Sequence, residues 1–184
     1  MIPRAVRQRI LGIDPGSRRT GFGVIDSDGR ESRYVASGCI GVGEQPWPER
    51  LLPIFDGVRA LLREHQPDRC AVEQLICARD PAAALKLGQA RGAVLCAVLH
   101  NGVPVCEYSP KAVKLAVVGT GGAAKQQIQH MVRILLRLSA LPGTDEADAL
   151  AVALCHAHAL NVPARRAATS WRDFRPGADA PSAR

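Results

Sequence analysis

One stretch near the N-terminus limits the possible folds more than any other part of the chain. Residues 9–26 read Arg-Ile-Leu-Gly-Ile-Asp-Pro-Gly-Ser-Arg-Arg-Thr-Gly-Phe-Gly-Val-Ile-Asp. The apolar run Ile10–Ile13 ends on the carboxylate of Asp14. The following Pro15-Gly16 favours a turn, because proline fixes φ and glycine accepts positive φ. A second apolar run, Gly21–Ile25, then predicts a β-hairpin with an acid at the mouth of a buried strand.

The rest of the chain alternates helix-like and strand-like segments. Glu49–Gln66 places apolar residues at helical spacing. Asp80-Pro81 supplies an N-cap and a first-turn proline for a second helix ending near Asn101. We expect Thr144 to be the N-cap of a last helix that ends near His158. The other predicted elements are strands over 31–43, 69–73 and 103–108 and helices over 110–118 and 123–138.

This order of elements is typical of an α/β domain with a mixed sheet and helices on both faces. A chain of 184 residues, 47% of them hydrophobic, is long enough to bury one core. We therefore expect a single domain over residues 1–160. Residues 161–184 are rich in Arg, Ala, Pro, Ser and Gly, which predicts a basic, disordered tail.

The charge and composition favour some classes of function over others. The formal net charge is +7 and the pI is near 9.5, which favours an anionic partner, most simply nucleic acid. No apolar run approaches the roughly 18 residues of a membrane span, and no signal-peptide core is present at the N-terminus. The six cysteines include no Cys-x-x-Cys pair, and we interpret most of them as buried free thiols in a reducing cytoplasm.

Four carboxylates are candidates for a common site. Asp14 and Glu73 both end predicted strands, so they meet at one sheet edge if those strands are neighbours. Asp145 and Asp148 are three residues apart at the start of the last helix and share one face. Four clustered acids require a cation, and hard oxygen ligands select Mg²⁺ or Mn²⁺; two such ions serve in-line phosphodiester cleavage. The alternative is that the helix acids complement the dipole and Glu73 lies at a solvated rim.

Several basic residues occupy positions that suit phosphate contacts. Lys111 and Lys114 lie on the predicted helix over 110–118, and Lys125 follows the glycine-rich loop 119–122. Lys86 and Arg91 lie on the helix that begins at Pro81. The alternative for each is a charged helix face exposed to water.

The motifs together resemble those of the RuvC-type Holliday-junction resolvases, members of the ribonuclease H-like superfamily. The resemblance covers about Gln8 to His158. Its main motifs are Leu-Gly-Ile-Asp14-Pro-Gly-Ser, Val-Glu73-Gln, Ala-Leu-Lys-Leu-Gly-Gln-Ala-Arg-Gly92, Val-Val-Gly-Thr-Gly through Lys125, and Thr-Asp145-Glu-Ala-Asp148-Ala-Leu-Ala.

The resemblance implies a ribonuclease H-like fold with a mixed five-stranded sheet and a metal-dependent junction nuclease acting in recombination and repair. It implies that Asp14, Glu73, Asp145 and Asp148 are catalytic metal ligands, joined by Lys125. It also implies a homodimer, two Mg²⁺ or Mn²⁺ ions per site, products with 5′-phosphate and 3′-hydroxyl ends, and a branch-migration motor as partner. The candidate DNA contacts are Ser17, Arg18, Gln74, Ile76, Lys86, Arg91, Lys111, Lys114 and Lys125.

The sequence departs from the family at one point. Family members often carry an aromatic residue shortly after the Glu-Gln pair, whereas Glu73-Gln74 is followed here by Leu75-Ile76. Ile76 can act as an apolar wedge between bases, but it has no π-face for stacking. The alternative for Leu75 and Ile76 is an exposed loop pair or a dimer contact.

Three other functions share some of these sequence features. Another ribonuclease H-like nuclease, of the YqgF type or specific for RNA:DNA hybrids, would share the same acids. The hairpin around Asp14 also resembles the phosphate-binding hairpin of actin-like ATPases, but those proteins need a second such hairpin and a longer chain. A catalytically inactive junction binder would gain nothing from acids placed near phosphate.

Overall fold

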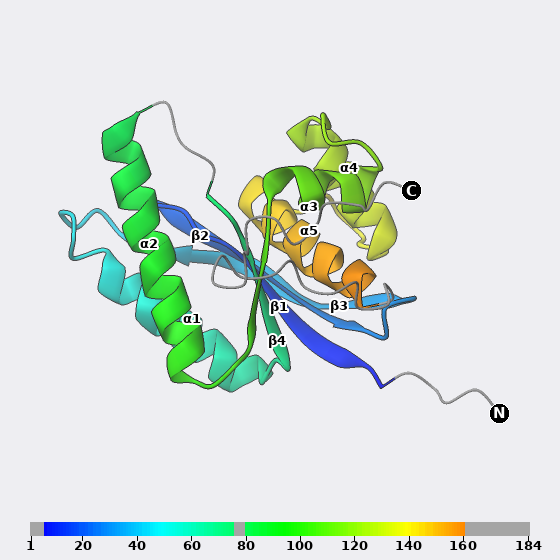
Figure 1. The fold of residues 1–184 in the computed structure, drawn as a ribbon, viewed down its shortest axis with the longest axis horizontal. Coiled ribbons are helices and arrows are strands. Elements are labelled where there is room, and N and C mark those ends of the chain that lie inside the picture. Colours follow the sequence, from blue (N-terminus) through cyan, green and yellow to red (C-terminus); the bar gives the residue numbers. More distant parts are fainter. Residues whose placement is uncertain (1–5, 76–79, 161–184) are drawn as a thin grey trace, which may run out of the picture.

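The structure, a computed structural model, describes residues 6–75 and 80–160 (Figure 1). Its strands are β1 (Gln8–Asp14), β2 (Arg19–Ser27), β3 (Ser32–Gly41), β4 (Arg69–Glu73) and β5 (Val105–Tyr108). Its helices are α1 (Leu51–His65), α2 (Pro81–His100), α3 (Pro110–Val118), α4 (Lys125–Leu135) and α5 (Thr144–Ala159). The tail predicted over residues 161–184 lies outside the described residues.

The five strands form one mixed sheet in the order β3-β2-β1-β4-β5. The predicted hairpin is present, because β1 and β2 pair antiparallel from Gln8↔Ser27 to Asp14↔Gly21. β3 extends this antiparallel part, while β4 pairs parallel with β1 and β5 pairs parallel with β4. β1 therefore lies at the centre of the sheet, and its C-terminal end points the same way as that of β4.

Helices cover both faces of the sheet, as the sequence predicts (Figure 1). On one face, buried residues of α1 and α2 pack with Leu11, Ile13 and Val24. On the other face, α3, α4 and α5 pack over Ile10 and Ile25. The alternation of β1 residues between the two clusters follows from the two-residue repeat of a strand.

The N-cap of α2 is the residue that the sequence predicts, whereas the N-cap of α5 is not. The Asp80 side chain caps α2 by accepting a hydrogen bond from the Ala82 N–H at 2.9 Å. The prediction that Thr144 caps the last helix is wrong, because Thr144 is already helical and Gly143 is the N-cap. The Gly143 carbonyl accepts the first helical hydrogen bond, from the Ala147 N–H at 2.8 Å.

The cysteines are less buried than expected. Cys70 and Cys155 are buried free thiols, Cys106 is half-buried, and Cys39 and Cys96 are exposed. Cys39 lies on the edge strand β3 and Cys96 on the outer side of α2, where an apolar local sequence does not ensure burial. Cys77 lies outside the described residues.

α2 is apolar and incompletely covered. By length and composition alone it could cross a membrane, which corrects the expectation that no segment approaches a span, although such a helix by itself is weak support for one. Its buried residues, among them Val94 and Val98, pack in the core with α1. Leu85 and Leu99, in contrast, are 71% and 63% exposed.

Candidate active site

Asp14 and Glu73 lie side by side at the edge of the sheet formed by the C-terminal ends of the neighbouring strands β1 and β4. The parallel register of β1 and β4 pairs Ile13 with Val72, so the acid that follows each of them ends its strand at the same level. The condition set by the sequence, that these two strands be neighbours, is met. Both acids are half-buried, because the strands that end there form the centre of the sheet.

α5 brings Asp145 and Asp148 to the same edge because it lies directly on glycines of β1 and β2. A Cβ on Gly21 would lie 2.1 Å from the Asp145 carbonyl oxygen, and one on Gly12 would lie 2.2 Å from the Ala149 carbonyl oxygen. Neither position accepts a side chain while the helix stays in place. Gly21 also pairs with Asp14, so the glycine that admits the helix end lies beside the acid of β1.

The pKa values of Asp14 and Glu73 are raised by burial and by the charge of neighbouring acids. Burial raises the pKa of Asp14 to about 7, with further increases from the charges of Glu73, Asp148 and Asp145. Burial and then the charge of Asp148 raise the pKa of Glu73. Burial and like charge therefore both disfavour the ionised forms of Asp14 and Glu73 in the absence of a compensating cation.

Two lysines partly compensate this charge. Lys125, the first residue of α4, places Nζ 3.2 Å from Asp148 Oδ2, and Asp148 is the main cause of the raised Lys125 pKa. Lys114 on α3 lowers the pKa of Glu73, although less than burial and Asp148 raise it. The Lys125 side chain is 70% exposed, so it can also reach a phosphate in solution.

The acids fit divalent metal ions by their chemistry. In the described part of the chain, no three His, Cys, Asp or Glu side chains lie close enough together to hold an ion as they stand. The donors are nevertheless hard carboxylate oxygens, which Mg²⁺ and Mn²⁺ prefer, and a cation would relieve the repulsion that raises the pKa of Asp14. The residues that would hold such an ion are Asp14, Glu73, Asp145 and Asp148.

Sequence reasoning missed Cys39 as a neighbour of the site. Cys39 on β3 pairs with Gly21, and its Sγ lies 3.9 Å from Asp145 Oδ2. Burial and then the charge of Asp145 raise the pKa of this thiol, so it remains protonated and contacts the acid as a neutral group. Only the strand order β3-β2-β1, which the local sequence does not specify, brings it there.

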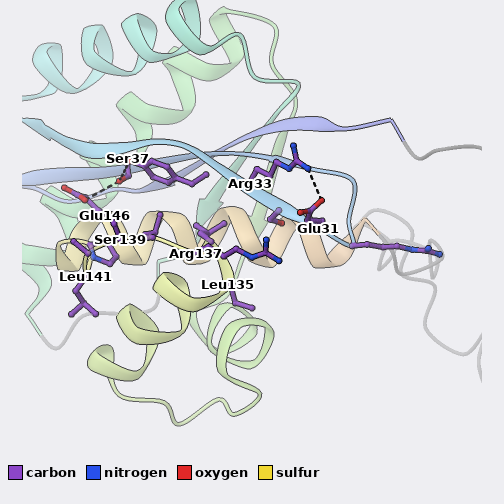
Figure 2. Close-up of a pocket in the computed structure, with 15 residues that line it drawn as sticks. Glu31, Arg33, Ser37, Leu135, Arg137, Ser139, Leu141 and Glu146 are labelled. Carbon is purple, nitrogen blue, oxygen red and sulfur yellow. Dashed lines mark hydrogen bonds and ion pairs between the residues drawn. The ribbon is translucent and has the colours of Figure 1, made fainter.

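Glu146, which lies next to Asp145 in the first turn of α5, contacts β3. Its Oε2 accepts a hydrogen bond from Ser37 Oγ at 3.3 Å, and it lines a cavity of about 870 Å³ between β3 and the loop after α4 (Figure 2). Its side chain is half-buried there. We call the cluster of Asp14, Glu73, Asp145 and Asp148 the acidic edge. None of these four acids lines the cavity.

The other candidate DNA contacts are placed in different ways. Ser17, Arg18 and Lys86 line one cavity, described below, and Gln74 is exposed just beyond β4. Arg91 is paired with Glu107 on β5. Lys111, on α3, is exposed beside the loop at Gly121. Ile76 lies outside the described residues.

The histidines near the end of α5 have structural partners. Tyr108 Oη and His156 Nδ1 form a hydrogen bond of 2.7 Å, and the His158 ring bonds the Ala116 carbonyl at 3.1 Å. Both rings are therefore engaged by groups of the fold at the end of α5.

Comparisons with known proteins give a consistent result. The family described as Crossover junction endodeoxyribonuclease RuvC matches residues 10–156. The chain is 56% identical over 168 residues to a protein of that name from Marinobacter nauticus, covering 91% of this chain and 95% of the relative. A relative of the same name from Alkalilimnicola ehrlichii is 52% identical, with 85% and 95% of the two chains covered.

Solved structures agree with these relatives. The structure of Thermus thermophilus RuvC in complex with Holliday junction substrate has a TM-score of 0.78 at 38% identity, covering 83% of this chain and 94% of that one. The yeast mitochondrial Holliday junction resolvase Ydc2 has a TM-score of 0.61 at 11% identity, covering 86% and 83%, and this likeness concerns the fold alone. The predicted ribonuclease H-like fold is confirmed.

Proposed function

The chain belongs to the RuvC family of crossover junction endodeoxyribonucleases, and we propose that it resolves four-way DNA junctions by paired, symmetric nicks in recombination and repair. One structural observation supports the proposed chemistry. Four carboxylates from β1, β4 and α5, with Lys125 at their rim, converge on the edge of the sheet.

Each acid has a role in this proposal. Asp14, Glu73, Asp145 and Asp148 would hold Mg²⁺ or Mn²⁺, two ions per site. Such ions would lower the pKa of a water and stabilise charge on the phosphate oxygens, and the hydrolysis would leave a 5′-phosphate and a 3′-hydroxyl.

Lys125 and Lys114 contribute positive charge on the DNA side of the acids. Without it, the approach of a phosphate to four carboxylates is repulsive. Lys125 forms an ion pair with Asp148, and the positive charge of Lys114 lowers the pKa of Glu73. Each lysine therefore reduces the net negative charge that an approaching phosphate meets. Ser17, Arg18, Gln74, Lys86 and Lys111 add contacts to the DNA backbone, and Ile76 and Arg91 complete the proposed set.

Resolution needs two cuts, and the described chain carries one acidic cluster. We therefore propose a homodimer that presents one site to each of two strands, since a two-fold dimer suits a junction with approximate two-fold symmetry. The exposed stripe of α2, defined by Leu85, Gly88, Gly92, Cys96 and Leu99, is the proposed contact. A Cβ at either glycine would meet nothing within 4 Å, so no other part of the described chain occupies the space that these glycines leave for a helix.

The cellular setting follows from the same proposal. The enzyme acts in the cytoplasm, where junctions form on chromosomal DNA, and a branch-migration motor delivers them.

A substrate panel tests the proposed function. Wild-type protein is incubated with a synthetic four-way junction, a duplex of the same sequence and an RNA:DNA hybrid, each with Mg²⁺, Mn²⁺ or EDTA. We expect paired nicks in the junction alone and only with a divalent metal. Preferential cleavage of the hybrid would instead assign a different ribonuclease H-like activity.

A further inference from the structure

A second cavity lies beside the acidic edge. Its volume is about 500 Å³, within the range of roughly 300–1,000 Å³ that is usual for small-molecule sites. Its lining includes Ser17, Arg18, Trp47, Arg50, Asp80 and Lys86. The turn after Asp14 connects it to the site, because this turn carries Ser17 and Arg18.

Positive charge predominates in this cavity. Arg18, Arg50 and Lys86 contribute three cations against the one carboxylate of Asp80. That carboxylate is engaged in capping α2. None of the three cations forms an ion pair with another residue of the described chain, so their charge is available to an anion.

The cavity also contains an aromatic ring. The chain has only seven aromatic residues, and the core or other contacts engage most of the described ones. Phe22 and Phe55 pack against the core, and Tyr108 bonds His156. Trp47 lines the cavity and is half-buried, and its indole N–H donates to Gln89 on α2. The hydrogen bond to Gln89 and contacts with the core therefore hold the Trp47 ring in place, and the ring borders a cavity lined by positively charged side chains.

An aromatic ring beside unpaired cations matches the chemistry of a nucleotide, which presents a flat base next to a phosphate. We propose that this cavity binds one nucleotide displaced from its stack at the centre of the junction, with the base on Trp47 and its phosphate on Arg18, Arg50 and Lys86. This inference rests on the proposed function, because it takes the ligand to be junction DNA. Neither Trp47 nor Arg50 stands out in the sequence, since the cavity joins segments from three parts of the chain.

Fluorescence tests the stacking contact directly. The second tryptophan is Trp171, so a Trp171→Phe background makes emission report Trp47. A four-way junction with 2-aminopurine at the crossover is titrated in EDTA, where no cleavage occurs. We expect quenching of Trp47 emission and a change in 2-aminopurine emission at the crossover but not in the arms. A duplex should cause neither change.

Substitutions separate stacking from a structural role. Trp47→Leu should weaken junction binding about 10- to 100-fold, and Trp47→Phe should recover most of the loss, since stacking on an aromatic ring accounts for the contact. Tyr34→Leu is the matched control, because Tyr34 is an exposed aromatic that lines the other cavity. Thermal unfolding of each variant verifies that it is folded. Lys86→Gln should flatten the salt dependence of binding without altering Trp47 emission in the free protein.

The readouts distinguish the two proposals. Junction cleavage by wild-type protein with quenching of Trp47 supports both. Cleavage without quenching, or junction affinity unchanged in a folded Trp47→Leu protein, overturns the nucleotide site and leaves the proposed function intact. Quenching at the crossover without cleavage in either metal overturns the proposed function and leaves the binding site standing.

Discussion

Within the acidic edge, burial and neighbouring negative charge raise the pKa of Asp14 most strongly. Its pKa of about 7 arises from burial and from three other carboxylates, and Lys125 opposes the rise. The acids and lysines therefore form one electrostatic unit, so a change in one lysine alters both the charge of the acids and the approach of DNA.

Lys114→Ala should weaken junction binding and flatten its salt dependence. Loss of one phosphate contact lowers the log–log slope of affinity against salt by about 0.9. Arg63→Ala is the control, because Arg63 is exposed in the last turn of α1, away from the lysines of α3 and α4. Binding titrations over a series of salt concentrations measure the slope. An unchanged slope in Lys114→Ala would remove this residue from the phosphate contacts.

His156 makes folding stability depend on pH. Burial, with a smaller effect of Arg69, lowers the pKa of His156 below its ordinary 6.5. The unfolded chain therefore binds this proton more readily than the folded one, and the stability contributed by neutral His156 is lost as pH falls below about 6.5. We expect His156→Gln to lose less stability than wild type between about pH 7.5 and pH 5.5. Thermal unfolding of both proteins over this pH series measures the difference.

Among the elements, α5 depends on glycines of the sheet for its position. Gly21→Ala should cost roughly 1–3 kcal/mol of unfolding free energy, since the added methyl meets the Asp145 backbone. It should also reduce cleavage, because the displaced helix end carries Asp145. Gly41→Ala on β3 is the control, as its Cβ would meet nothing within 4 Å. Equal stability and activity of the two variants would show that the close approach of α5 is not needed.

The sequence predicts those parts of the site that depend on local pattern. Asp14 and Glu73 are recognisable because each ends a short apolar run, and Asp145 and Asp148 because they share a helix face. Cys39 could not be predicted, since its contact with Asp145 depends on which strands pair. The Thr144 cap was predicted wrongly because threonine is the commoner N-cap, whereas the helix begins one residue earlier and Gly143 takes this position without a side-chain cap.

At the scale of the whole molecule, the proposed dimer joins two acidic edges. Leu85→Glu on α2 should shift the protein to monomers, because it places a charge in an apolar helix contact, and analytical ultracentrifugation would detect the change. Leu52→Glu on α1 is the control, with a leucine that is 63% exposed. A monomeric wild-type protein, or a dimer unaffected by Leu85→Glu, would exclude the α2 stripe as the contact.

Comparing junction binding with junction cleavage in one variant tests whether the four carboxylates form the active site. Wild-type and Asp14→Asn proteins are compared on the same four-way junction, with binding measured in EDTA and cleavage measured after addition of Mg²⁺ or Mn²⁺. We expect the Asn variant to bind the junction at least as tightly, because it removes a negative charge near phosphate, and to produce no nicks. Cleavage by Asp14→Asn at the wild-type rate would contradict the assignment of the four-carboxylate edge as the active site.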